Sequence, residues 1–388
     1  MIDLPPAKPR PLATGGQWAA SLLALGIVGS AIVGLQLWRD LAWTDHLDVR
    51  ARYDVALSDA SKWSTALESN LQNGDNLLRV SGLVAESATG YAEDSAIESL
   101  TASESAFSSV VTSAEATANW VAPQHESLDE RALLWEVLGE SSALRDATAT
   151  LAADSERLHK ATATLIGEGD EFEAAIVTLI NTVGAVGESQ LPRYPSATNE
   201  SYRDLKTAVD SAISHRAVDS RSTWIVERVV ETTDAFAASH AEKEAAKAGP
   251  LAARRTEIED FARSIAGGVR IDFTWQDIVI GHGQGRSAAG TATWDTADSG
   301  YSSVTLTNSI ARYWTEWAGY RSLVAHEIGH SITSKCYEAF KDGPFGNDNE
   351  RWATAWAIGM GYTVAAANGS DLYGAPTAEQ INATMSCR

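Results

Sequence analysis

The chain has 388 residues, enough for two or more domains, and a formal net charge of −21. The acidic excess lies in the middle, because residues 39–262 carry 19 basic and 38 acidic side chains, net −19, whereas residues 263–388 carry 9 and 12, net −3. Nucleic-acid phosphates are bound by Lys and Arg, so this balance argues against a nucleic-acid partner. Solvated helix faces are the simplest explanation for the charge.

The N-terminal part is predicted to be a tail followed by a membrane anchor. Residues 1–17 contain four prolines and are expected to be disordered, whereas residues 18–38 run from Trp18 to Trp38 without a charge. Twenty-one uncharged residues suit a bilayer core, and tryptophans suit its two interfaces. A cleavable signal peptide is the alternative, but no clear cleavage site follows. We therefore expect a single-pass protein of the cell membrane.

Residues 39–262 are predicted to form an acidic helical stalk or bundle. The residues Val137, Leu144, Leu151, Leu158 and Leu165 recur every seven positions, which is typical of a coiled-coil seam. Such a seam allows the stalk to associate with itself. Prolines predict breaks near residues 123, 192–195 and 250.

A faint repeat favours duplicated hairpins within this region. Residues 77–87 resemble residues 179–189 at an offset of 102, but only six positions match, and chance similarity explains them nearly as well.

Residues 263–388 are predicted to form a small α+β domain. Alternation predicts strands at 269–275, 291–294 and 303–307, ahead of an amphipathic helix that includes Trp314, Trp317, Val324 and Ile328. The fold class is therefore α+β overall, with one transmembrane helix, a long helical stalk and this C-terminal domain.

The predicted helix carries His326-Glu327-Ile328-Gly329-His330. Residues four apart share one helix face, so His326 and His330 can bind one metal ion, and Glu327 can reach a water beside it. A second predicted helix carries Glu350 in its first turn. Two imidazoles and one carboxylate form a known catalytic zinc set.

These residues resemble the zincin metallopeptidases of the gluzincin, thermolysin-like type. Glu350 lies twenty residues after His330 and follows Asn349, as in that family. The resemblance implies a peptidase with Zn²⁺ bound by His326, His330 and Glu350, with Glu327 as general base and a peptide or protein as substrate. It covers residues 263–388 at most.

One position departs from the family pattern. The family has an Asp that orients the first histidine where this chain has Thr354, and this loss weakens metal binding unless a backbone carbonyl or another acid replaces the Asp. Cys336, Asp342 and Asp348 remain alternative third ligands.

The resemblance also implies two further features. The strand before the active-site helix pairs with substrate in zincins, which makes Ser303, Val304, Thr305, Leu306 and Thr307 the candidate substrate edge. An oxyanion stabiliser is expected from a downstream part, but no His follows His330. Tyr362, Tyr373 and Arg351 are the candidates.

The only two cysteines, Cys336 and Cys387, both lie in the C-terminal domain. They suggest one disulfide in an oxidising compartment, with two unpaired thiols as the alternative. The domain is therefore expected to be extracytoplasmic. The alternative function is a catalytically silent zincin-like domain that acts as a surface binding or structural protein.

Overall fold

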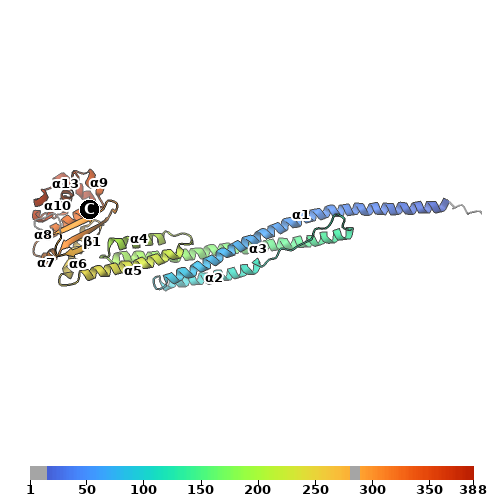
Figure 1. The fold of residues 1–388 in the computed structure, drawn as a ribbon, viewed down its shortest axis with the longest axis horizontal. Coiled ribbons are helices and arrows are strands. Elements are labelled where there is room, and N and C mark those ends of the chain that lie inside the picture. Colours follow the sequence, from blue (N-terminus) through green and yellow to red (C-terminus); the bar gives the residue numbers. More distant parts are fainter. Residues whose placement is uncertain (1–14, 280–288) are drawn as a thin grey trace, which may run out of the picture. The chain divides into compact units, whose positions relative to one another are not determined.

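A computed structural model describes residues 15–279 and 289–388, with side chains from residue 33 onward. By contacts, the chain divides into two units. The first comprises residues up to Arg79 with Thr101–Ala174, and the second comprises Val80–Leu100 with Ala175–Arg388. The fold is mostly helical, with a small mixed sheet near the C-terminus (Figure 1).

Three long helices make up most of the first unit and continue into the second. They are α1 (Gly15–Ala88), α2 (Asp94–Ala118) and α3 (Leu134–Gln190). All five positions of the predicted seven-residue seam lie in α3 and are buried. Leu144 and Leu151 pack with Val49 and Tyr53 of α1, so the helices of one chain cover this part of the seam. Self-association of the stalk stays a prediction.

The predicted N-terminal segments fall largely outside the described residues. Residues 1–14 of the predicted tail are not described, and α1 already begins at Gly15 rather than after residue 17. Most side chains of the predicted anchor at 18–38 are also not described. In the described part of the chain, we find no helix with the length and apolar character of a membrane span.

The second unit continues with shorter helices, and the expected prolines lie between them. A 3-10 turn (Leu191–Arg193) contains Pro192, and α4 (Asn199–Ile213) follows. Next come α5 (Ser222–Ala246) and α6 (Ala252–Ile265), which flank Pro250. Ile258 and Ala262 of α6 belong to the C-terminal core, although both lie within residues 39–262, the predicted stalk. The core of the C-terminal part therefore includes residues that precede residue 263.

Three strands form the sheet in the order β1-β3-β2. They are β1 (Arg270–Gln276), β2 (Gly290–Trp294) and β3 (Tyr301–Thr307), close to the predicted ranges. β1 runs parallel to β3, and β2 runs antiparallel to it. β3 is thus the central strand, and both its edges are paired. The expectation that Ser303–Thr307 is a free substrate edge is wrong, because β1 and β2 occupy the edges of the described sheet.

The remaining helices of the C-terminal part come after the sheet in the sequence. Their bounds are α7 (Asn308–Tyr313), α8 (Gly319–Ile332), α9 (Tyr337–Asp342), α10 (Asn349–Gly359), α11 (Ala365–Asn368), α12 (Ser370–Tyr373) and α13 (Ala378–Thr384), with a final 3-10 turn (Met385–Cys387). A capping box formed by Thr377 and Gln380 starts α13.

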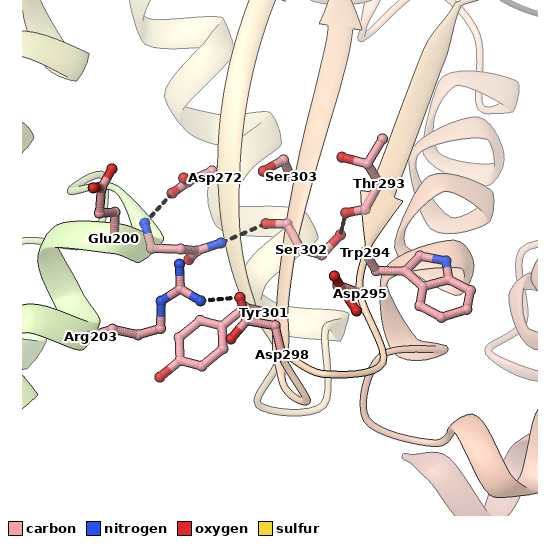
Figure 2. A pocket seen from close by; sticks show the side chains of 11 residues that line it. Glu200, Arg203, Asp272, Thr293, Trp294, Asp295, Asp298, Tyr301, Ser302 and Ser303 are labelled. Atoms are coloured by element: carbon pink, nitrogen blue, oxygen red, sulfur yellow. Dashed lines mark hydrogen bonds and ion pairs between the residues drawn. The ribbon is translucent and has the colours of Figure 1, made fainter. Parts of the chain in front are cut away.

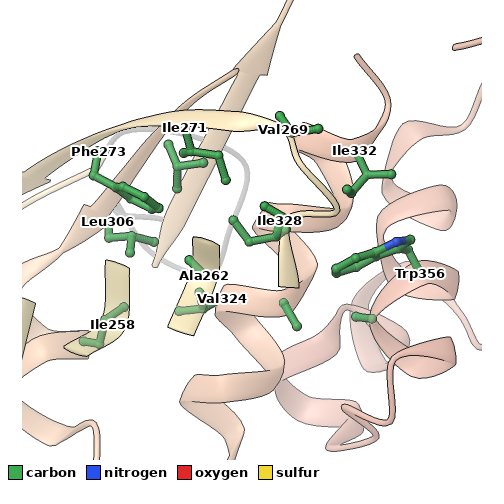
Figure 3. Close-up of a cluster of buried hydrophobic side chains, with 14 of the residues drawn as sticks. Ile258, Ala262, Val269, Ile271, Phe273, Leu306, Val324, Ile328, Ile332 and Trp356 are labelled. Carbon is green, nitrogen blue, oxygen red and sulfur yellow. The ribbon is translucent and has the colours of Figure 1, made fainter. Parts of the chain in front are cut away.

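The core of this part lies between the sheet and α8. Val324, Ile328 and Ile332, spaced four residues apart, share one core with Phe273 and Leu306 (Figure 3). Every residue of α8 from Val324 onward is buried, so this part of the helix is covered on several sides rather than amphipathic. Trp314 and Trp317 precede α8 instead of extending it.

Candidate metal centre

Helix α8 carries three buried side chains that are candidates for a functional site. His326, Glu327 and His330 are each 7% exposed. The four-residue spacing turns both imidazoles to one side, and their Nε2 atoms lie 3.2 Å apart. Buried titratable side chains are costly without partners. Their placement together therefore indicates a built site.

Helix α10 supplies the third side chain. Asp348 caps this helix by accepting a hydrogen bond from the backbone N–H of Arg351, which places Glu350 in the first turn. Oε2 of Glu350 lies 3.1 Å from Nε2 of His326 and 3.3 Å from Nε2 of His330. The spacing-based prediction that these three residues converge is confirmed.

A close approach of two helices makes this convergence possible. A Cβ atom on Gly329 would lie 2.7 Å from Cα of Ala353, so α10 packs directly on the backbone of α8. The indole Nε1 of Trp352 donates a buried hydrogen bond of 3.0 Å to the carbonyl of Gly329. The glycine within the His-Glu-Ile-Gly-His motif therefore serves the approach of Glu350.

The three donor atoms fit one small cation. Zinc with bonds of about 2.0–2.1 Å in tetrahedral geometry separates its ligand atoms by about 3.3 Å. The observed separations are 3.1, 3.2 and 3.3 Å. Two imidazole nitrogens and one carboxylate also match the donor types that zinc accepts at catalytic sites. The residues present fit a zinc ion.

A backbone carbonyl orients the first histidine. Nδ1 of His326 donates a hydrogen bond of 3.0 Å to the carbonyl of Asn368, which leaves Nε2 for the metal. Thr354 Oγ1, at the position of the missing Asp, lies 3.5 Å from the same nitrogen. The departure from the family pattern is therefore compensated by Asn368, a residue that sequence reasoning did not identify.

The turn that contains Asn368 requires a glycine at the next position. Gly369 has a φ of +93°, and a Cβ there would lie 2.5 Å from Thr354 Oγ1 and 2.9 Å from His326 Cε1. Asn368 is 1% exposed. Its side-chain amide donates a hydrogen bond to the carbonyl of Tyr362 and accepts one from the backbone N–H of Ser370. An Asn-Gly pair is the sequence signal for such a turn.

Glu327 lies beside the three ligands, against the sheet. A Cβ on Gly290 would lie 2.9 Å from Cγ of Glu327, so the start of β2 borders this carboxyl group. Burial raises the pKa of Glu327, and the neighbouring His330 and His326 only partly oppose this shift. The group therefore has a high affinity for a proton.

Glu350 and His330 shift each other's pKa in opposite directions. Burial alone would raise the pKa of Glu350, but hydrogen bonds with His326 and His330 hold it well below its usual range. Burial alone would lower the pKa of His330, but the hydrogen bond with Glu350 and the charge of Glu327 raise it. Without a metal, negative charge on Glu350 and positive charge on His330 stabilise each other.

The three candidate oxyanion stabilisers lie in different places. The ring of Tyr373 stacks on His326 with centroids 6.0 Å apart. Burial and then the charge and hydrogen bond of Glu350 raise the pKa of Tyr373 to about 12, so its hydroxyl stays a donor. Tyr362 instead packs edge-on against Phe261, and Arg351 pairs with Asp348. Of the three, Tyr373 is placed next to the candidate ligands.

The cysteines and the rival ligands take structural positions. Cys336 and Cys387 form a disulfide, which confirms the predicted bond and ties the turn after α8 to the C-terminus. Cys336 is thus unavailable as a thiolate ligand. Asp348 caps α10, and Asp342 is exposed at the end of α9. Neither carboxylate belongs to the cluster of potential ligands.

A separate polar cavity of about 340 Å³ lies where α4 meets the sheet (Figure 2). Asp272 accepts a hydrogen bond from the backbone N–H of Asn199, whose side chain donates to the carbonyl of Ser302. Arg203 pairs with Asp298 at the same cavity. The bonds of Asn199 join α4 to β1 and β3, and the Arg203–Asp298 pair joins α4 to the loop between β2 and β3. None of His326, His330 and Glu350 lines this cavity.

Comparison with known proteins adds no family. No protein-family description, curated protein or solved structure matches this chain. The functional argument therefore rests on the site alone.

Proposed function

We propose that this chain is a membrane-anchored, zinc-dependent metallopeptidase. The observation that carries the proposal is the convergence of His326, His330 and Glu350, with the carboxyl group of Glu327 buried beside them. A site that served only structure would close the metal with four protein ligands, and Glu327 is not needed to hold the ion.

A bound zinc ion would be a Lewis acid that polarises the scissile carbonyl and lowers the pKa of water. His326, held by the Asn368 carbonyl, together with His330 and Glu350, fixes its position. Glu327 takes a proton from water as the oxygen attacks the carbonyl carbon. It then delivers that proton to the amine as the C–N bond breaks. Burial favours this role, because it strengthens the carboxylate as a base.

The hydroxyl of Tyr373 is the proposed donor to the developing oxyanion. Its ring lies on His326, and its raised pKa keeps the proton in place. The edge of β2, which begins beside Glu327 at Gly290, is the proposed strand for pairing with a substrate backbone. It replaces β3 in this role.

The proposed location is the outer side of the cell membrane, with residues 18–38 as the anchor. The run from Trp18 to Trp38 contains no charge. The Cys336–Cys387 disulfide favours an oxidising compartment for the C-terminal part. Labelling of the C-terminal part on intact cells with an impermeant reagent tests this orientation. The proposed orientation is wrong if that part is labelled only in permeabilised cells.

Zinc content and hydrolysis of a peptide library test the activity on the purified full chain. Glu327→Gln is expected to retain one zinc per chain and to lose hydrolysis by about 10²-fold or more, since the general base is removed. Glu338→Gln is the matched control, because Glu338 is exposed on α9. A Glu327→Gln variant as active as the parent would overturn the mechanism. Zinc without turnover in the parent would leave a binding protein.

A further inference from the structure

The segment between α2 and α3 doubles back along α1 within the first unit. The hydroxyl of Tyr53 donates to the carbonyl of Pro123, and Arg50 donates to that of His125. Nearer the start of α1, Arg39 donates to the carbonyls of Glu130 and Ala132. The segment therefore runs toward the N-terminal end of α1 and reaches the level of Arg39.

Helix α3 then starts at that level and runs in the same direction as α1. His46 Nδ1 lies 3.3 Å from Ser141 Oγ, and Arg145 pairs with Asp45. The carboxylate of Glu136 accepts a hydrogen bond of 2.7 Å from the backbone N–H of Leu133 and fixes the start of the helix. The turn at Leu133 thus lies beside Arg39 of α1. Arg39 follows Trp38, the last residue of the uncharged run.

This turn exposes an apolar patch. Leu133 is 48% exposed, Trp135 is 68% exposed and Leu138 is 52% exposed. On α1, Trp38 and Leu41 at the same level are 70% and 69% exposed. An apolar patch of this kind marks an interaction site, and tryptophan favours the boundary between lipid and water.

We propose that Leu133, Trp135 and Leu138 form a membrane collar that inserts into the lipid interface where the anchor ends. The inference rests on the proposed anchor at 18–38. Nearby charges include Asp129, Glu130 and Glu136 against Arg131, so the contact is apolar rather than an attraction to anionic lipid. The collar gives the helical unit a second attachment and holds α3 at a fixed height above the bilayer.

The test uses the full chain reconstituted in phosphatidylcholine vesicles that carry spin-labelled lipid. Because the two native cysteines form a disulfide, a cysteine introduced by Trp135→Cys or Leu138→Cys is the one labelled with a fluorophore. Val55→Cys is the matched control, since Val55 is 70% exposed on α1. It lies sixteen residues beyond Arg39, about 24 Å along the helix.

Lipid quenching at positions 135 and 138 is expected to exceed that at position 55 by about twofold or more. Equal quenching at the three positions would overturn the collar. Protection from iodide without lipid quenching would also overturn it, because a second copy of the chain would then cover the patch. Alkaline extraction distinguishes a failure of the anchor from a failure of the collar. A chain that leaves the vesicles refutes the anchor and the collar together, whereas a retained chain without quenching refutes the collar alone.

Discussion

Gly329 and Ala353 bring α8 and α10 into backbone contact, and this contact decides whether Glu350 reaches the two histidines. A Cβ on Gly329 would lie 2.7 Å from Cα and 2.8 Å from the carbonyl oxygen of Ala353. Backbone atoms cannot rotate away as a side chain can, so any larger residue at position 329 must separate the helices.

Gly329→Ala is therefore expected to weaken zinc binding and to destabilise the fold by about 1–3 kcal/mol, the usual range for overpacking. Chelator competition and urea unfolding measure the two effects. Gly139→Ala is the control, because Gly139 lies in α3 with nothing within 4 Å of its would-be Cβ. That variant should be neutral or slightly stabilised. Unchanged zinc affinity in Gly329→Ala would show that the helix contact does not set the site.

A comparison of substitutions at Gly369 and Gly374 distinguishes the effect of backbone strain from the effect of disturbing His326. Both have positive φ, at +93° and +88°, but only Gly369 leaves no room for a Cβ beside Thr354 and His326. Gly369→Ala should lower zinc affinity by about 10- to 100-fold, the usual effect of disturbing a residue that orients a ligand. Gly374→Ala should have little effect on affinity. Equal losses in both variants would indicate strain alone.

Tyr373→Phe tests the proposed oxyanion donor. The ring should keep its stacking on His326 while the hydroxyl and its hydrogen bond with Glu350 are lost, so KM should change little. A fall in kcat of about 10²–10³-fold is expected for loss of such a donor. Tyr362→Phe serves as the control, because Tyr362 packs against Phe261. A Tyr373→Phe variant with normal kcat would assign the tyrosine to packing.

Parts of the site could be predicted from sequence because they depend on local geometry. The helical period alone places His326 and His330 together, and the disulfide needed only two cysteines in one domain. Glu350 was found through the spacing of a known family, which reflects the length of the intervening turn. Each of these signals lies in residue identity or in a short stretch of chain.

Other parts depend on contacts that residue identity does not encode. The carbonyl of Asn368 orients His326, but every residue carries a carbonyl, so its role is visible only in the fold. Strand order is also a long-range property. β1 pairs directly with β3, although β2 lies between them in the sequence, and this makes Ser303–Thr307 central rather than an edge. The core residues of α6 were missed for the same reason, since Ile258 packs across a distance in sequence.

Zinc binding should depend on pH through His330. Its pKa is raised above the ordinary value of 6.5, whereas the pKa of Glu350 is held far down. Glu350 is therefore charged throughout the neutral range, and the proton that competes with the metal is on the imidazole. As pH rises past 6.5, His330 continues to lose protons, so zinc affinity should keep increasing where an ordinary histidine site has levelled off.

Isothermal titration at several pH values measures this rise. The protons released per zinc in buffers of different ionisation enthalpy give an independent count. Affinity that is flat above pH 6.5, without proton release, would show that the imidazole is already neutral before the metal binds.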